Sequence, residues 1–179
     1  MTNREIAAVL FNISTILREQ RANPYRIRAY RRAAQNILRA RHSVAEKAAA
    51  GEPLGIPSLG KRLTTKINQL AVEGHCDFYD ELCGDLPGAE QKLLKVPGIG
   101  PLLARRVAKD LGAQEADDLI RRAAGIGLQQ VWGIGPKRAA AILEGIGTQQ
   151  TEAAPAVVRD GNVIYVQEAL WNGERKKAA

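Results

Sequence analysis

Apolar residues recur at helical spacing through most of the first 147 residues of the chain. In residues 3–21 they stand at Ile6, Val9, Leu10, Ile13, Ile16 and Leu17. A period of three to four residues predicts amphipathic helices that bury one face. After residue 155 the pattern changes to two short apolar runs around Asp160-Gly161, which predict a β-hairpin. We therefore expect an all-α fold with a short C-terminal β-hairpin.

One five-residue phrase occurs three times, at 56–60, 96–100 and 131–135. The later copies read Val-Pro-Gly-Ile-Gly and Val-Trp-Gly-Ile-Gly, and in the first copy Ser58 replaces the first glycine. A small residue and then a branched apolar residue follow each copy at the same distances: Thr64 and Ile67, Ala104 and Val107, Ala139 and Ile142. In the second and third copies a proline opens the next segment and a glycine, Gly112 or Gly147, closes it. The repeat predicts a tight turn, a helix start, a buried helical face and a C-terminal cap.

The repeated turn also predicts a binding chemistry. A Gly-x-Gly turn takes positive φ angles and exposes backbone N–H groups at a helix N-terminus, where anions bind. This is the helix-hairpin-helix pattern, and the anion it usually meets is a nucleic-acid phosphate. The alternative is a hairpin that needs glycine only to turn. Three copies, each followed by basic residues, favour the phosphate interpretation.

The charge of the chain points to the same partner. Its net charge is +7 and its pI is about 9.7, and residues 21–41 hold a run of arginines without an acidic residue. A solvated helix face would carry glutamate partners, so a surface that faces phosphates is favoured. The candidate DNA-binding residues are Arg26, Arg28, Arg32, Gly60, Lys61, Arg62, Gly98, Gly100, Arg105, Gly133, Gly135, Lys137 and Arg138.

Other classes of site have little support in the sequence. Cys76 and Cys83 form no disulfide framework, and with His75 they lack a fourth metal ligand nearby. We expect no metal site and no cofactor, although a monovalent cation at a hairpin turn is compatible with the pattern. The chain has no apolar leader at its start and no long apolar run, so we expect a soluble cytoplasmic protein without a membrane segment.

Composition divides the chain into three parts. Residues 1–83 form the first expected domain, in which Asp77 is expected to cap a short last helix. The stretch 83–88 is expected to be a linker, and 88–147 a domain with two helix-hairpin-helix motifs. The last part, 148–179, is expected to be a linker, the β-hairpin with Trp171 as its anchor, and a disordered tail.

Two blocks together resemble a known family. The run Asn23-Pro24-Tyr25-Arg26-Ile27-Arg28-Ala29-Tyr30-Arg31-Arg32-Ala33-Ala34, with the hairpin at 56–70, resembles the N-terminal lyase domain of X-family DNA polymerases, especially the bacterial kind. Residues 96–147 resemble the fingers subdomain of the same family, so the resemblance covers about 3–147. It implies binding to gapped DNA through backbone phosphates. In some members the first domain also removes a 5′-deoxyribose phosphate through a Schiff base.

The resemblance implies roles for individual residues. Lys66 matches the family's Schiff-base lysine, Tyr30 a tyrosine that lines the lyase pocket, and Arg26 a basic phosphate ligand. Phe78 stands where a further pocket lysine is expected. A lysine nucleophile needs a depressed pKa, and the cations Arg26, Lys61 and Arg62 are one means of depressing it.

Parts of the family pattern are missing from this chain. No paired-Asp motif of a palm domain follows residue 147, and Asp117-Asp118 point about 100° apart on a helix, which does not suit two-metal chemistry. The His/Asp-rich phosphoesterase domain found in many bacterial members is also missing. We therefore expect neither polymerase nor nuclease activity from this chain alone.

Three hypotheses follow, and the sequence leaves them open. The favoured one is a non-catalytic module that binds gapped, nicked or branched DNA in repair, beside a separate repair enzyme. The second is a deoxyribose-phosphate or abasic-site lyase with Lys66 as its nucleophile. The third and weakest is a protein-interaction domain that keeps the fold.

Overall fold

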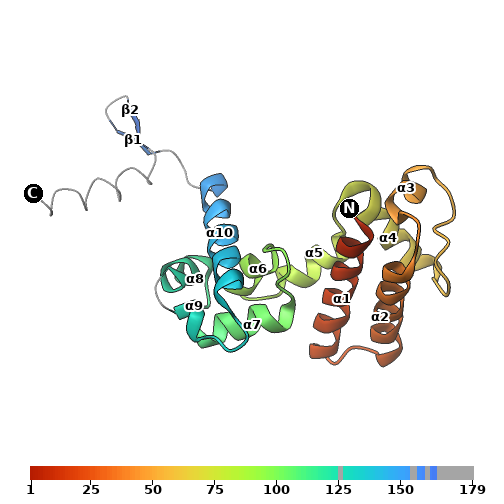
Figure 1. Ribbon diagram of the computed structural model, residues 1–179, viewed down its shortest axis with the longest axis horizontal. Helices are drawn as coiled ribbons and strands as arrows, with labels where there is room; N and C mark the ends of the chain where they lie inside the picture. Colours follow the sequence, from red (N-terminus) through yellow and green to blue (C-terminus); the bar gives the residue numbers. More distant parts are fainter. Residues whose placement is uncertain (125–126, 154–156, 160–161, 165–179) are drawn as a thin grey trace, which may run out of the picture.

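The computed structural model describes residues 1–124, 127–153, 157–159 and 162–164. Its helices form two groups that meet near α5 (Figure 1). The first group consists of α1 (Asn3–Glu19), α2 (Pro24–Arg39), α3 (Val44–Ala49), α4 (Lys61–Glu73) and α5 (Asp77–Gly84). The second consists of α6 (Gly88–Leu94), α7 (Pro101–Asp110), α8 (Ala116–Ala123), α9 (Gly127–Gln130) and α10 (Pro136–Ala153). The predicted all-α architecture is confirmed for the described residues up to 153, and none of their helices is long and apolar enough to cross a membrane.

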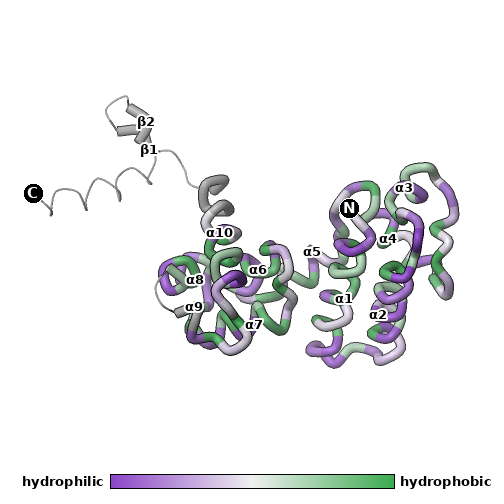
Figure 2. Tube along the Cα trace, viewed as in Figure 1, coloured by the Kyte–Doolittle hydropathy of each residue, from purple (hydrophilic) through white to green (hydrophobic). Residues whose placement is uncertain are grey.

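Each group of helices has its own hydrophobic core. Side chains from α1 to α5 form the first core, with Leu10, Ile37 and Ile67 fully buried. Side chains from α6 to α10 form the second, with Val107 and Ile142 fully buried. Hydrophobic positions run through both groups of helices (Figure 2). The branched residue that follows each copy of the repeat is therefore a core residue, as the pattern predicts.

The backbone of the three turns agrees with the repeat. Gly98 has φ of +81° and Gly133 has φ of +86°, the left-handed region that glycine enters without strain. Ser58 takes the same conformation with φ of +60°, although it carries a Cβ. The last glycine of the first two copies is extended and acts as the N-cap, with φ of −79° at Gly60 and −96° at Gly100. The third residue of all three turns thus lies in the left-handed region.

Three expected boundaries were wrong. The N-cap of α5 is Cys76, not Asp77, and the Asp77 carboxylate instead accepts a hydrogen bond from Gln69 Nε2 at 2.8 Å. The helix α5 runs through Gly84, so the connection to α6 is shorter than the expected linker. Gly147 is not a cap, because α10 continues to Ala153. A single glycine weakens a helix by only about 1 kcal/mol, and no proline follows Gly147 until Pro155.

Two three-residue strands follow α10. The strand β1 (Val157–Arg159) pairs antiparallel with β2 (Asn162–Ile164), and Val158 lies opposite Val163. The expected Asp160-Gly161 turn lies outside the described residues, so the β-hairpin as a whole stays a prediction. The expected anchor Trp171 and the expected disordered tail also lie outside them.

Candidate nucleic-acid interface

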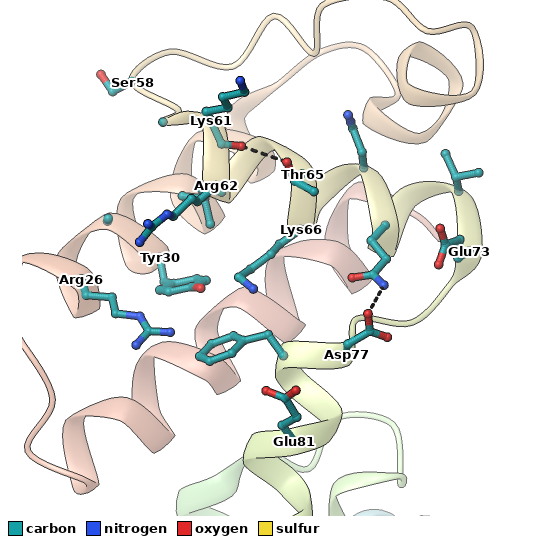
Figure 3. A pocket seen from close by; sticks show the side chains of 17 residues that line it. Arg26, Tyr30, Ser58, Lys61, Arg62, Thr65, Lys66, Glu73, Asp77 and Glu81 are labelled. Carbon is teal, nitrogen blue, oxygen red and sulfur yellow. Dashed lines mark hydrogen bonds between the residues drawn. The ribbon is translucent and has the colours of Figure 1, made fainter.

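A cavity of ≈ 1260 Å³ lies between α2, α4 and α5 in the first group of helices (Figure 3). Two pairs of its lining residues are each four positions apart on one helix, so the members of each pair lie on the same helix face. Arg26 and Tyr30 stand one turn apart on α2, and Arg62 and Lys66 stand one turn apart on α4. The sequence separates these pairs by about 30 residues, and the packing of the helices brings them to one place.

Phe78 of α5 lines this cavity together with Arg26, Tyr30 and Lys66. Its ring is stacked with the Tyr30 ring, with 6.0 Å between the centroids. The Lys66 Nζ lies 4.3 Å from the Phe78 centroid, and the Arg26 Cζ lies 4.5 Å from it. Both cations lie against the electron-rich ring, an attraction worth about 0.5–2 kcal/mol per pair. Phe78 therefore holds the two predicted functional cations beside one another.

Tyr30 is the most buried of the predicted pocket residues. Only 5% of its surface is exposed, and this burial raises the pKa of its hydroxyl, against the opposing effect of the hydrogen bond and charge of Arg26. The hydroxyl is therefore protonated at neutral pH, so it can donate a hydrogen bond to a sugar or phosphate oxygen.

The structure assembles some of the predicted residues and separates others. Arg26, Tyr30, Gly60, Lys61, Arg62 and Lys66 all line the cavity. Arg28 and Arg32 do not, and they lie exposed elsewhere on α2, where the Arg28 guanidinium sits 4.7 Å from the Tyr25 ring centroid. The arginine run thus divides into a cavity residue and an outer surface.

Sequence reasoning missed the acidic part of the cavity. Glu73, Asp77 and Glu81 line it together with the four basic residues. Helical spacing could have indicated them, since Glu73 is seven residues from Lys66 and Asp77 is four residues from Glu81. Within the described residues no carboxylate pairs with Lys66, so its amine remains available.

The repeated turns expose their amide groups. Among the described residues, the N–H groups of Gly60, Gly98, Gly100, Gly133 and Gly135 donate no hydrogen bond. The turn residues between the glycines point inward instead, and Ile99 and Ile134 are buried. Free amides beside a helix N-terminus form a concave site for an anion.

Side chains around the third turn are also basic. Lys137 and Arg138 are exposed at the start of α10, and the Arg138 Nη1 donates to the Gly133 carbonyl at 2.9 Å. Arg138 therefore contacts a turn glycine directly, and Lys137 is exposed beside it in the sequence.

Arg105 is placed differently from the other candidates. Its Nη2 lies 3.0 Å from Glu19 Oε2 on α1, and its Nε lies 3.6 Å from Glu90 Oε1 on α6. The Glu19 oxygen is buried and accepts no hydrogen bond, so Arg105 supplies its compensating charge. Burial raises the pKa of the Glu90 carboxyl, and Arg105 opposes that rise. Arg105 thus joins the two groups of helices.

We expect Arg105→Ala to lower the free energy of unfolding by about 1–2 kcal/mol, because two partly buried carboxylates lose their positive partner. DNA affinity should change little. Urea denaturation of the variant, beside the exposed Lys109→Ala on the same helix, measures the difference. Equal stability of the two variants would show that the ion pair contributes nothing.

The described residues contain no group of three His, Cys, Asp or Glu side chains that could hold a metal ion. Asp118, one of the two adjacent aspartates considered for two-metal chemistry, instead forms an ion pair with Arg121 on α8. A monovalent cation at a hairpin turn stays a prediction.

Comparison with known proteins agrees with this architecture. Residues 1–76 match the helix-hairpin-helix domain family, and residues 90–147 match the SAM-like helix-hairpin-helix tandem family. The chain is 25% identical over 147 residues to DNA polymerase/3'-5' exonuclease PolX of Bacillus subtilis (strain 168). The match covers 82% of this chain and 25% of that protein, so the chain spans about a quarter of the length of its relative. The resemblance inferred from the sequence is confirmed: this is a helix-hairpin-helix protein that resembles the N-terminal part of PolX.

Proposed function

We propose that this protein binds DNA through backbone phosphates, without sequence preference, at gaps, nicks or branches during DNA repair. The proposal rests on three turns whose third residue has a positive φ and whose described glycine amides at Gly60, Gly98, Gly100, Gly133 and Gly135 donate no hydrogen bond. Backbone amides bind phosphate oxygens and reach no base edge, so they position DNA without reading its sequence. The similarity to PolX, whose name states that it acts on DNA, supports the same conclusion.

The distribution of the turns supports a preference for interrupted DNA. The first turn belongs to the first group of helices, and the other two belong to the second group. A ligand that touches all of them must bend or offer two separate backbone segments. Gapped and nicked duplexes do both at low cost, because they lack the continuous stacking that stiffens an intact duplex. A separate repair enzyme would then act on the bound site.

Binding should depend strongly on salt and weakly on sequence. Contact with about three to six phosphates gives a log–log slope of roughly −3 to −5 for the association constant against salt concentration. Fluorescence anisotropy on gapped DNA of two unrelated sequences measures both properties. A slope near zero, or a strong preference for one sequence, would contradict the proposal.

The two parts of the arginine run should behave differently. Arg28→Ala with Arg32→Ala should weaken binding to every DNA tested and flatten the salt slope by up to ~1 for each lost phosphate contact. Arg26→Ala should weaken binding mainly to gapped DNA that carries a 5′-phosphate, because its guanidinium lies in the cavity. Anisotropy on gapped DNA with and without that phosphate separates the two effects. If the double variant binds like the parent, the outer surface of α2 faces away from DNA.

A second candidate function rests on the cavity itself. Lys66, Tyr30 and Arg26 gather around Phe78, as expected for a lyase that uses a Schiff base. Lys66 Nζ would attack the sugar aldehyde, lose water to form an imine, and so acidify the neighbouring C2′ proton. Loss of that proton then expels the 3′ oxygen with its DNA strand. Phe78 stands where the family resemblance predicts a further pocket lysine. The cavity therefore has one cation fewer with which to bind a 5′-phosphate. For this reason we rank the lyase function second.

A further inference from the structure

The indole of Trp132 is the most exposed large hydrophobic side chain in the described part of the protein. It stands in the third turn, between α9 and α10, with 79% of its surface accessible. Its neighbours Val131 and Ile134 are buried in the second core. The equivalent residues of the other turns, Pro57 and Pro97, are exposed as well. The position therefore faces outward in every copy, and the Trp132 ring belongs to neither hydrophobic core.

Two arginines hold the backbone around this ring. The Arg106 guanidinium of α7 lies 5.0 Å from the Trp132 ring centroid, and its Nη1 donates to the Trp132 carbonyl at 3.4 Å. Arg138 donates to the next carbonyl, that of Gly133, at 2.9 Å. These contacts reduce the entropy that the turn would lose when a ligand binds. The third turn, residues 131–135, thus holds the Trp132 ring in place with most of its surface accessible.

The surroundings identify the chemistry of the ligand. Arg106, Lys137 and Arg138 are exposed cations at this turn, and the Gly133 and Gly135 amides are free. A ligand that suits this site carries negative charge and a flat ring within a few ångströms of one another. A nucleotide strand has both, because each base is attached to a phosphate-linked sugar. Aromatic side chains stack on such bases regardless of sequence.

We propose that Trp132 stacks on an unpaired DNA base whose neighbouring phosphate binds the Gly133–Gly135 amides. In an intact duplex both faces of each interior base are already covered by its neighbours. Stacking on Trp132 therefore favours DNA with an unstacked base, as at a gap, a frayed end or a single strand. This inference rests on the proposed DNA binding and adds the feature that distinguishes damaged from intact DNA.

The test compares Trp132→Ala and Trp132→Phe with the parent on gapped DNA, single-stranded DNA and intact duplex. We expect Trp132→Ala to lose roughly 5- to 100-fold in affinity for the first two and to bind intact duplex like the parent. Trp132→Phe keeps a ring and should retain most of the affinity. Equal losses on all three DNAs would overturn the inference, as would unchanged binding by Trp132→Ala.

A second readout reports the stacking directly. The chain has two tryptophans, so Trp171→Phe leaves Trp132 as its only indole fluorophore. Stacking should quench this fluorescence on addition of single-stranded DNA, at the concentrations where anisotropy shows binding. Binding without quenching would refute the stacking while leaving the proposed function intact. A parent protein that binds none of the DNAs would instead refute the proposed function.

Discussion

Replacing Gly60 and Gly135 together by valine should weaken binding to gapped DNA by about 100-fold while the helices remain folded. A Cβ at either position meets nothing within 4 Å, and neither residue has a positive φ. A Cβ therefore fits at both positions, and we expect the fold to accept the substitutions. A bound phosphate does not accept them, because valine would occupy the space beside the free amides. Charge-assisted hydrogen bonds contribute about 1.5–3 kcal/mol each, so losing one at each turn accounts for tenfold per site.

The choice of glycine matters for this experiment. Gly98 and Gly133 have positive φ, so any substitution there strains the turn and a loss of binding would have two causes. A Cβ on Gly100 would lie 3.3 Å from Asn12 Oδ1 of α1, which disturbs the contact between the helix groups. Gly60 and Gly135 avoid both problems and isolate the contact with DNA.

A matched control is available at the end of α5. Gly84 also has open space for a Cβ and no positive φ, but it belongs to no turn of the repeat. Gly84→Val should bind like the parent, and circular dichroism should give the same helical content for all variants. If the double variant binds as tightly as Gly84→Val, the turns serve only the fold.

Lys66→Ala should abolish covalent trapping on 5′-deoxyribose-phosphate DNA, if the lyase function holds. Borohydride reduces the imine between Lys66 and the sugar to a stable amine, so the parent should yield a protein–DNA adduct on a denaturing gel. Without the amine no imine forms at this position, and the adduct should fall by at least about 100-fold, the usual effect of removing a covalent nucleophile. Tyr30 and Arg26 would still hold the sugar and its phosphate.

Two further variants separate chemistry from binding. Lys66→Arg keeps the positive charge beside Phe78 but forms no Schiff base, so it should bind gapped DNA like the parent and give no adduct. Lys109→Ala changes an exposed lysine on α7, outside the cavity, and should keep the adduct. An adduct that persists in Lys66→Arg would mean that other lysines attack the sugar. No adduct from a parent that binds the same DNA would leave phosphate binding as the function.

The sequence alone determined the local architecture of this protein. Helical periodicity identified Ile67, Val107 and Ile142 as core residues, and all three are fully buried. The repeated phrase predicted the positive φ of Gly98 and Gly133. These properties depend on backbone sterics and on the burial of one helix face, so neighbouring residues encode them. The predicted helix end at Gly147 was wrong. A single glycine ends a helix only weakly, and the residues after Gly147 can continue it to Ala153.

The partners of the exposed and half-exposed side chains depend on how the helices pack, which the sequence pattern does not reveal. Phe78 of α5 contacts Arg26 of α2 and Lys66 of α4, residues that lie 52 and 12 positions away in the sequence. Arg105 and Arg106 are adjacent on α7, yet the first pairs with Glu19 and the second lies against the Trp132 ring. The sequence pattern does not distinguish the two residues. An arginine on an exposed helix face can contact a phosphate, a carboxylate, an aromatic ring or water. The angles at which helices pack select among these partners, and helical periodicity does not specify those angles.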